Sequence, residues 1–151
     1  MGKSGQYKDQ EECAGMKYGY FDDKKREYVI TRPDTPAPWV NYLGDPEYGA
    51  IVSNNAGGYS FVKSGANGRI IRYRFNSNIG LPGRYIYIRD NDAKDYWSCT
   101  WQPVGKPLDQ YKTECHHGTA YTTIKSDYAD IHSELTYYVP LNKTYEVWRT
   151  K

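Results

Sequence analysis

Arginine and aromatic side chains are the residues of this sequence that point most directly to ligand chemistry. In the run 69–75, Arg72 and Arg74 alternate with Ile71, Tyr73 and Phe75, so a strand would place both guanidinium groups on one face. Guanidinium groups bind phosphate and carboxylate through paired hydrogen bonds. This face is therefore either a ligand-binding face or a solvated one that pairs with acidic residues on a neighbouring strand.

A second strand-like run carries a possible stacking surface. Trp97, Cys99 and Trp101 alternate, so they share one face of a strand and would form a flat aromatic strip if that face were exposed. Carbohydrate-binding modules use such strips to stack sugar rings. Because large rings are usually buried, we expect instead that both tryptophans lie in the core.

A loop between two strands, residues 54–60, carries paired glycines among amide and hydroxyl side chains. Gly57 and Gly58 permit positive φ and a close backbone approach. The loop therefore either contacts a ligand or forms a bulged hairpin.

The sequence predicts no catalytic residue and no metal site. In Cys115-His116-His117, strand alternation sends the two histidines to opposite faces, and no second ligand pair lies at zinc-like spacing. No nucleophile elbow, phosphate loop or zinc-protease motif is present. The acidic turn 90–95 lacks the central Gly and terminal Glu of a calcium loop, so we expect a hairpin there.

The whole chain after residue 16 reads as short strands separated by turn residues, which predicts an all-β, antiparallel β-sandwich with no substantial helix. The Pro-rich segment 32–38 cannot be a central strand and should be a stiff surface crossover. The expected strands are 17–21, 27–31, 40–43, 50–53, 59–63, 69–75, 84–89, 96–101, 112–116, 121–125, 131–139 and 144–149.

Length and composition favour one domain over residues 16–151, preceded by a disordered leader at 1–15. The net charge of +2 gives no field that would attract a polyanion, so no nucleic-acid partner is expected. No apolar run is long enough to span a membrane. With an odd set of 3 cysteines, reduced thiols and a cytoplasmic location are the simplest expectation.

Several motifs together resemble the opening of the disaccharide phosphorylases of glycoside hydrolase family 94, of the cellobiose and N,N'-diacetylchitobiose phosphorylase type. The similarity covers residues 16–151. The motifs that carry it are Met16-Lys17-Tyr18-Gly19-Tyr20-Phe21-Asp22-Asp23, Pro38-Trp39-Val40-Asn41-Tyr42-Leu43-Gly44, Asn55-Ala56-Gly57-Gly58-Tyr59-Ser60-Phe61, Gly83-Arg84-Tyr85-Ile86-Tyr87-Ile88-Arg89-Asp90 and Trp101-Gln102-Pro103-Val104.

The resemblance implies part of an N-terminal β-sandwich domain of the super-sandwich type, incomplete relative to the family, without the (α/α)6 catalytic barrel. Family enzymes carry out inverting phosphorolysis of a β-linked disaccharide, with inorganic phosphate as co-substrate and no other cofactor. An aspartic acid of the barrel protonates the leaving oxygen, and no residue of this chain corresponds to it. The chain alone is thus expected to be inactive, with a catalytic barrel domain or chain as partner and a homodimer as the full enzyme.

If such a barrel joins this domain, the residues expected to line its sugar pocket are Trp39, Asn41, Tyr42, Asn55, Tyr59, Ser60, Arg72 and Arg74. A stand-alone carbohydrate-binding module is the alternative. An RNA-binding role has only a faint motif, residues 58–63, in its favour, because the helices of an RNA-recognition fold are missing and the charge is near neutral.

Overall fold

The computed structural model describes residues 17–71 and 83–151, and within these ranges the chain forms twelve strands and no helix. It follows that no described helix could cross a membrane. The predicted leader, 1–15, lies outside the described residues. The strands are β1 (Gly19–Asp22), β2 (Glu27–Ile30), β3 (Val40–Asp45), β4 (Tyr48–Ser53), β5 (Gly58–Val62), β6 (Arg69–Ile71), β7 (Tyr87–Asp90), β8 (Asp95–Ser98), β9 (Lys112–His117), β10 (Tyr121–Tyr128), β11 (Ile131–Tyr138) and β12 (Val147–Thr150).

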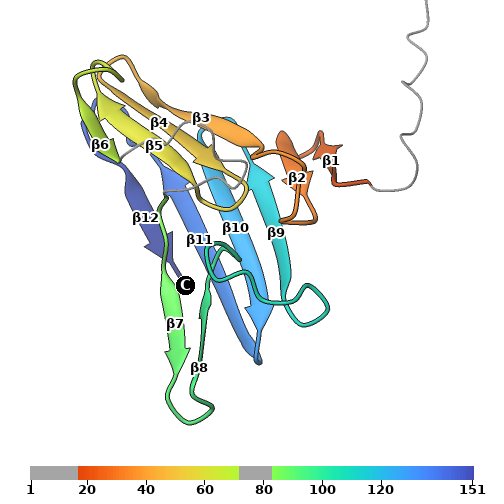
Figure 1. Cartoon of the computed structure of the whole chain (residues 1–151). Helices are drawn as coiled ribbons and strands as arrows, with labels where there is room; N and C mark the ends of the chain where they lie inside the picture. The colour runs from red at the N-terminus through yellow and green to blue at the C-terminus, as the bar shows by residue number, and fades with distance from the viewer. Residues whose placement is uncertain (1–16, 72–82) are drawn as a thin grey trace, which may run out of the picture.

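The strands form two facing sheets and one separate hairpin, all antiparallel (Figure 1). A six-stranded sheet has the order β1-β2-β9-β10-β11-β12, and a four-stranded sheet has the order β3-β4-β5-β6. Among the described strands, β7 pairs with β8 alone. Figure 1 shows β3–β6 at one end of the long strands β9–β11, with the β7–β8 hairpin running toward their other end. The predicted all-β antiparallel sandwich is confirmed.

The core lies between the two sheets and follows from strand alternation. Ile30, Cys115, Ile124 and Leu135 are register neighbours across β2, β9, β10 and β11, and all are almost fully buried. The four-stranded sheet contributes Leu43, Tyr48, Ala50 and Val52 to the same cluster. Because successive residues point to opposite faces, the alternate side chains of these strands point away from this core.

Acidic residues close the hairpin turns that the sequence predicted. Asp22 Oδ1 accepts hydrogen bonds from the N–H groups of Lys24 and Lys25 after β1. Asp90 Oδ1 does the same for Asp92 and Ala93 between β7 and β8. These side chains replace backbone partners at the turn, which is why Asp is favoured there.

Each expected strand has one observed counterpart, but most boundaries differ by one to three residues. Two of the larger differences have a physical reason that the structure shows. The run expected at 84–89 becomes a strand only at Tyr87, because the Arg84 N–H donates to the Ala56 carbonyl instead of to a hairpin partner. The run expected at 96–101 ends at Ser98, since Trp101 has a φ of 67° and its N–H donates to Tyr111 Oη. Of the expected strand 69–75, residues 72–75 lie outside the described part of the chain.

The Pro-rich crossover joins the two sheets as predicted, although one end of it is not on the surface. β2 ends at Ile30, and Pro33 is buried. The Pro33 carbonyl accepts hydrogen bonds from the side-chain amides of Asn54 and Asn55, at 3.1 and 2.8 Å. A carbonyl that is taken out of water needs such partners, so the crossover is held to the loop before β5.

Candidate ligand-binding surfaces

The described residues among those predicted to line a sugar pocket lie on different faces of the structure. Tyr42 and Tyr59 lie on the outer face of the four-stranded sheet, whereas Asn41 and Ser60 point inward from the same strands, β3 and β5. Arg72 and Arg74 lie outside the described residues, so the predicted arginine face stays a prediction. The two remaining residues of the predicted set, Trp39 and Asn55, lie where the two sheets meet.

The outer face of the four-stranded sheet is aromatic. Tyr42, Ile51 and Tyr59 are register neighbours across β3, β4 and β5, and Tyr42 is 72% exposed. In the adjacent row Gly44 and Gly49 leave a groove of about 370 Å³ beside Phe61. The rings of Tyr59 and Phe61 stack with centroids 5.6 Å apart.

The glycines of this groove are required by close contacts. A Cβ on Gly49 would lie 2.5 Å from the ring of Phe61, which rests directly over the glycine. A Cβ on Gly44, which has a φ of +145°, would lie 2.1 Å from the Tyr48 carbonyl oxygen. Strand alternation places Phe61 on the same face as Tyr59, so the sequence held the signal that would have added Phe61 to the predicted site.

Asn41 and Trp39 hold the two sheets together. Asn41 Nδ2 donates to the carbonyls of Gly118 and Tyr121, at 2.8 and 3.0 Å, and so fastens β3 to the turn between β9 and β10. The Trp39 ring lies against Tyr28 and Tyr18, with centroid distances of 5.7 and 6.0 Å. Both side chains are engaged by the fold itself.

Asn55 is held by a hydrogen bond within the structure, and Ser60 is buried. Asn55 donates to Pro33 in the crossover, and its Oδ1 atom has no hydrogen-bond partner among the described residues. Ser60 has no exposed surface. Of the predicted set, Tyr42 and Tyr59 are thus the described side chains that the fold leaves on an outer face.

The two adjacent histidines have separate structural roles, as strand alternation predicted. His117 faces the core, where burial lowers its pKa; its Nε2 atom lies 3.1 Å from the Trp39 carbonyl, and its Nδ1 atom lies 3.0 Å from Thr122 Oγ1. His116 points to the other face and lies 2.9 Å from Glu27 through Nδ1. Within residues 17–71 and 83–151, no group of three or more His, Cys, Asp or Glu side chains is placed so that it could hold a metal ion.

Trp97 and Cys99 are core residues, so the exposed aromatic strip does not form. Each is 1% exposed. Trp101 leaves the strand and donates from its indole nitrogen to the Lys106 carbonyl at 2.7 Å. The expected reduced thiols are found at Cys99 and Cys115, which are both free and buried; Cys13 is outside the described residues.

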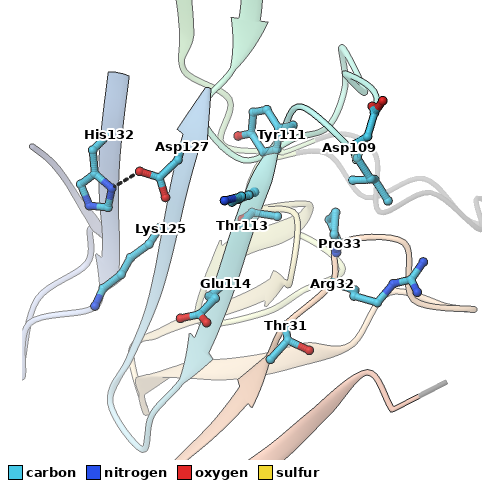
Figure 2. Close-up of a pocket in the computed structure, with 12 residues that line it drawn as sticks. Thr31, Arg32, Pro33, Asp109, Tyr111, Thr113, Glu114, Lys125, Asp127 and His132 are labelled. Atoms are coloured by element: carbon cyan, nitrogen blue, oxygen red, sulfur yellow. Dashed lines mark hydrogen bonds and ion pairs between the residues drawn. The ribbon is translucent and has the colours of Figure 1, made fainter. Parts of the chain in front are cut away.

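A second groove, of about 790 Å³, lies over the six-stranded sheet where β2 leaves β9 (Figure 2). Figure 2 shows His132 and Asp127 pointing toward one another, at 2.8 Å, and Arg32 directed away from both. In register across the strands, Lys112 faces Asp127 and Glu114 faces Lys125. These charges alternate in sign across one face, which is the arrangement of a solvated sheet surface and not of convergent catalytic groups.

Two buried ionic networks had no signal in the sequence. Glu27, which is 8% exposed, accepts hydrogen bonds from Tyr121 and His116. Arg84, which has no exposed surface, makes a paired contact with Glu146 at 2.7 and 2.8 Å. The partners are 62 or more residues apart along the chain, so spacing rules could not reveal them.

The comparisons with known proteins agree with this fold. A family model described as glycosyl hydrolase 94, supersandwich domain, matches residues 26–151. N,N'-diacetylchitobiose phosphorylases of Vibrio proteolyticus and Vibrio furnissii are 50% and 49% identical over 133 residues, which are 88% of this chain and 17% of each relative. The 3-O-beta-D-glucopyranosyl-beta-D-glucuronide phosphorylase of Paenibacillus borealis is 33% identical over 132 residues, 87% of this chain and 16% of that relative. The chain thus spans less than a fifth of the length of each of these relatives. Because the supersandwich model matches residues 26–151, the chain belongs to glycoside hydrolase family 94.

Proposed function

We propose that this chain serves as the noncatalytic N-terminal supersandwich domain of a disaccharide phosphorylase. The observation that carries the proposal is the supersandwich match over residues 26–151, together with relatives that are named phosphorylases. The partner of the domain is then a catalytic barrel, either in the same polypeptide or in a second one.

The chemistry of phosphorolysis explains why this domain needs a catalytic partner. Inorganic phosphate attacks the anomeric carbon, the glycosidic C–O bond breaks, and a carboxylic acid protonates the leaving oxygen, so the products are a sugar 1-phosphate and a sugar. Such an acid has to be protonated near neutral pH, which requires a raised pKa.

Among the described residues, five carboxyl groups have a pKa that departs clearly from its ordinary value, and all five pKa values are shifted in the opposite direction. Hydrogen bonds or ion pairs lower the pKa of each one whose pKa departs clearly from its ordinary value, and each has a donor beside it: Glu27, Asp34, Asp45, Asp95 and Glu134. This supports a domain that supplies structure and surface, while the proton donor comes from the partner.

In this proposal the domain borders the sugar pocket of the complete enzyme and contributes to a cytoplasmic homodimer. The substrate is a β-linked disaccharide, and inorganic phosphate is the co-substrate, with no other cofactor. Tyr42 and Tyr59 are the described residues of the predicted set whose side chains lie on the outer face of the four-stranded sheet. Arg72 and Arg74 stay candidates from the sequence.

The test is a domain exchange in a relative. The stretch of the Vibrio proteolyticus enzyme that matches this chain is replaced by residues 17–151, and phosphate-dependent cleavage of N,N'-diacetylchitobiose is measured. We expect the hybrid to be active, a version with that stretch deleted to lose most activity, and the isolated chain to have none.

Two results would contradict the proposal. One is phosphorolysis by the isolated chain. The other is a hybrid that is folded, as judged by its cooperative unfolding, but no more active than the deleted version.

A further inference from the structure

The β7–β8 hairpin presents a tyrosine–arginine strip that the proposed function does not use. Arg89 and Tyr96 are register neighbours, and Tyr87 pairs with Ser98, so Tyr87, Arg89 and Tyr96 share one face. Tyr87 is 54% exposed and Tyr96 is 57% exposed. The described residues thus leave about half of each ring uncovered.

The opposite face fastens the hairpin to the sandwich. Trp97 is 1% exposed, and its ring lies 5.0 Å from that of Tyr128 on β10. Tyr128 Oη donates to Asp95 Oδ2 at 2.8 Å, and Lys106 forms an ion pair with the other oxygen of Asp95. A two-stranded hairpin is only marginally stable alone, so these contacts are what hold the outer strip in place.

A groove of about 530 Å³ is lined by the three residues of the strip and by Lys94, and also by Ile88 and Asp95, which alternate onto the opposite face of the hairpin. Tyr87 and Tyr96 are diagonal neighbours across the strands, which separates such pairs by about 7–8 Å. Arg89 carries donors in a planar fork on the same face. Lys106 Nζ lies 5.9 Å from the centre of the Tyr96 ring.

We propose that this strip binds a short saccharide. A pyranose has an apolar face of C–H groups that packs on a tyrosine ring, and its hydroxyl groups at the rim accept hydrogen bonds from Arg89 and Lys94. Tyrosine suits this role, because its ring is flat and apolar while its hydroxyl group stays hydrated. The choice of β-linked disaccharides as probes rests on the proposed function. The proposal that sugar rings stack on the strip rests instead on the positions of its two tyrosines.

The size of the face favours a small ligand over a protein partner. Strands of this length extend about 14 Å and lie about 5 Å apart, so the backbone of the face has a projected area on the order of 100–150 Å². Its two half-exposed tyrosine rings add on the order of 200 Å² of accessible surface. A stable protein interface buries about 800 Å² on each partner. One or two sugar rings match the strip, whereas a protein would need surface that the hairpin lacks.

The experiment is a titration of the isotope-labelled chain with N,N'-diacetylchitobiose and with cellobiose, followed by the shifts of its backbone amide signals. We expect saturable shifts concentrated at residues 87–90 and 95–98. Tyr87→Ala and Tyr96→Ala should each weaken binding about twofold to tenfold, the loss expected for one ring contact. Tyr87→Phe keeps the ring and should bind nearly as the original chain does.

Tyr42→Ala is the matched control, because Tyr42 is 72% exposed on a different sheet. The proposal is overturned if no saturable shifts occur, if Tyr42→Ala removes the binding, or if the alanine variants of the hairpin, with otherwise unchanged amide spectra, bind like the original chain. Concentration-dependent broadening without sugar that Tyr87→Ala abolishes would assign the strip to a protein contact and also overturn it.

The titration tests the saccharide strip, and the domain exchange tests the proposed function, so each proposal can be overturned without the other. An active hybrid with no sugar shifts would overturn the saccharide strip alone. Sugar shifts at the hairpin with an inactive hybrid would overturn the proposed function alone.

Discussion

Glu27 is a buried carboxylate whose hydrogen bonds join β2 to β9 and β10. Tyr121 Oη donates to Oε1 at 2.5 Å, and His116 Nδ1 donates to Oε2 at 2.9 Å. Burial by itself raises the pKa of Glu27, but the hydrogen bonds from Tyr121 and His116 outweigh it, so the pKa is lowered. The same contact raises the pKa of Tyr121. The folded chain thus favours the ionised form of Glu27.

Glu27→Gln should therefore lower the free energy of unfolding in a pH-dependent way. At pH 7 we expect a loss of about 1–3 kcal/mol, because hydrogen bonds to a charged group are replaced by weaker ones. The pKa is lower in the folded state than in the unfolded state, so the contribution is full above the unfolded pKa and disappears as the pH falls through the folded pKa. Urea denaturation at about pH 7 and about pH 3 measures the difference.

Glu47→Gln is the control, because Glu47 has a side chain that is 56% exposed and a single ion pair at 3.9 Å. Its effect should stay within about 0.5 kcal/mol at either pH. A Glu27→Gln loss of the same size at both pH values would argue against an ionised, hydrogen-bonded Glu27.

At the scale of elements, Arg84 connects the four-stranded sheet to the segment before β12. Its guanidinium pairs with Glu146 and donates to the Ile51 carbonyl of β4 at 3.1 Å. Its own carbonyl accepts from Tyr137 Oη of β11 at 3.1 Å. Since Arg84 is fully buried, its ion pair with Glu146 is shielded from water. The stability that the pair adds to the fold therefore depends on all the hydrogen bonds of the guanidinium group.

Arg84→Ala should cost about 3–5 kcal/mol of unfolding free energy, because it leaves Glu146 as an uncompensated charge. Domains of this kind have only about 5–15 kcal/mol in total, so the variant would be close to unfolding. The double variant Arg84→Met with Glu146→Leu should be more stable than Arg84→Ala, since neither charge is then left without a partner. Urea denaturation of the single and double variants measures both effects.

Arg32→Met is the comparison, because the Arg32–Asp34 pair has side chains 38% and 32% exposed. Exposed pairs contribute about 0–1 kcal/mol. Equal losses for Arg84→Ala and Arg32→Met would show that the buried pair has no special role.

At the scale of the whole molecule, the edge strands of the described sheets carry exposed aromatic or aliphatic side chains. β1 and β12 are the edges of the six-stranded sheet, and β3 and β6 are the edges of the four-stranded sheet. Phe21 on β1 is 76% exposed and Trp148 on β12 is 42% exposed. Edge strands with apolar side chains are the usual sites of pairing with another chain.

Phe21→Lys should therefore reduce self-association of the chain, because a charged residue on an edge strand opposes pairing. Sedimentation velocity over a range of protein concentrations is the measurement. Tyr145→Lys, at a ring that is 52% exposed but outside the strands, is the control. A chain that stays monomeric at every concentration, or that responds equally to both substitutions, would contradict the role of β1.

The sequence by itself determined the positions of the strands and the class of the fold. Turn residues such as Asp22 and Asp90 bond to the backbone next to them, and strand alternation is also local, so both can be read from neighbouring residues. The family resemblance is equally visible in the motifs, and the family model matches residues 26–151.

Only the tertiary structure decided which face of each strand points inward and which distant residues meet. Alternation shows that Trp97 and Cys99 share a face, but it cannot show that this face is buried. Asn41 was predicted to face a sugar, yet its amide bonds to carbonyls 77 and 80 residues away. Contacts of this kind depend on how two sheets pack, and that packing is a property of the whole chain and not of any local run of residues.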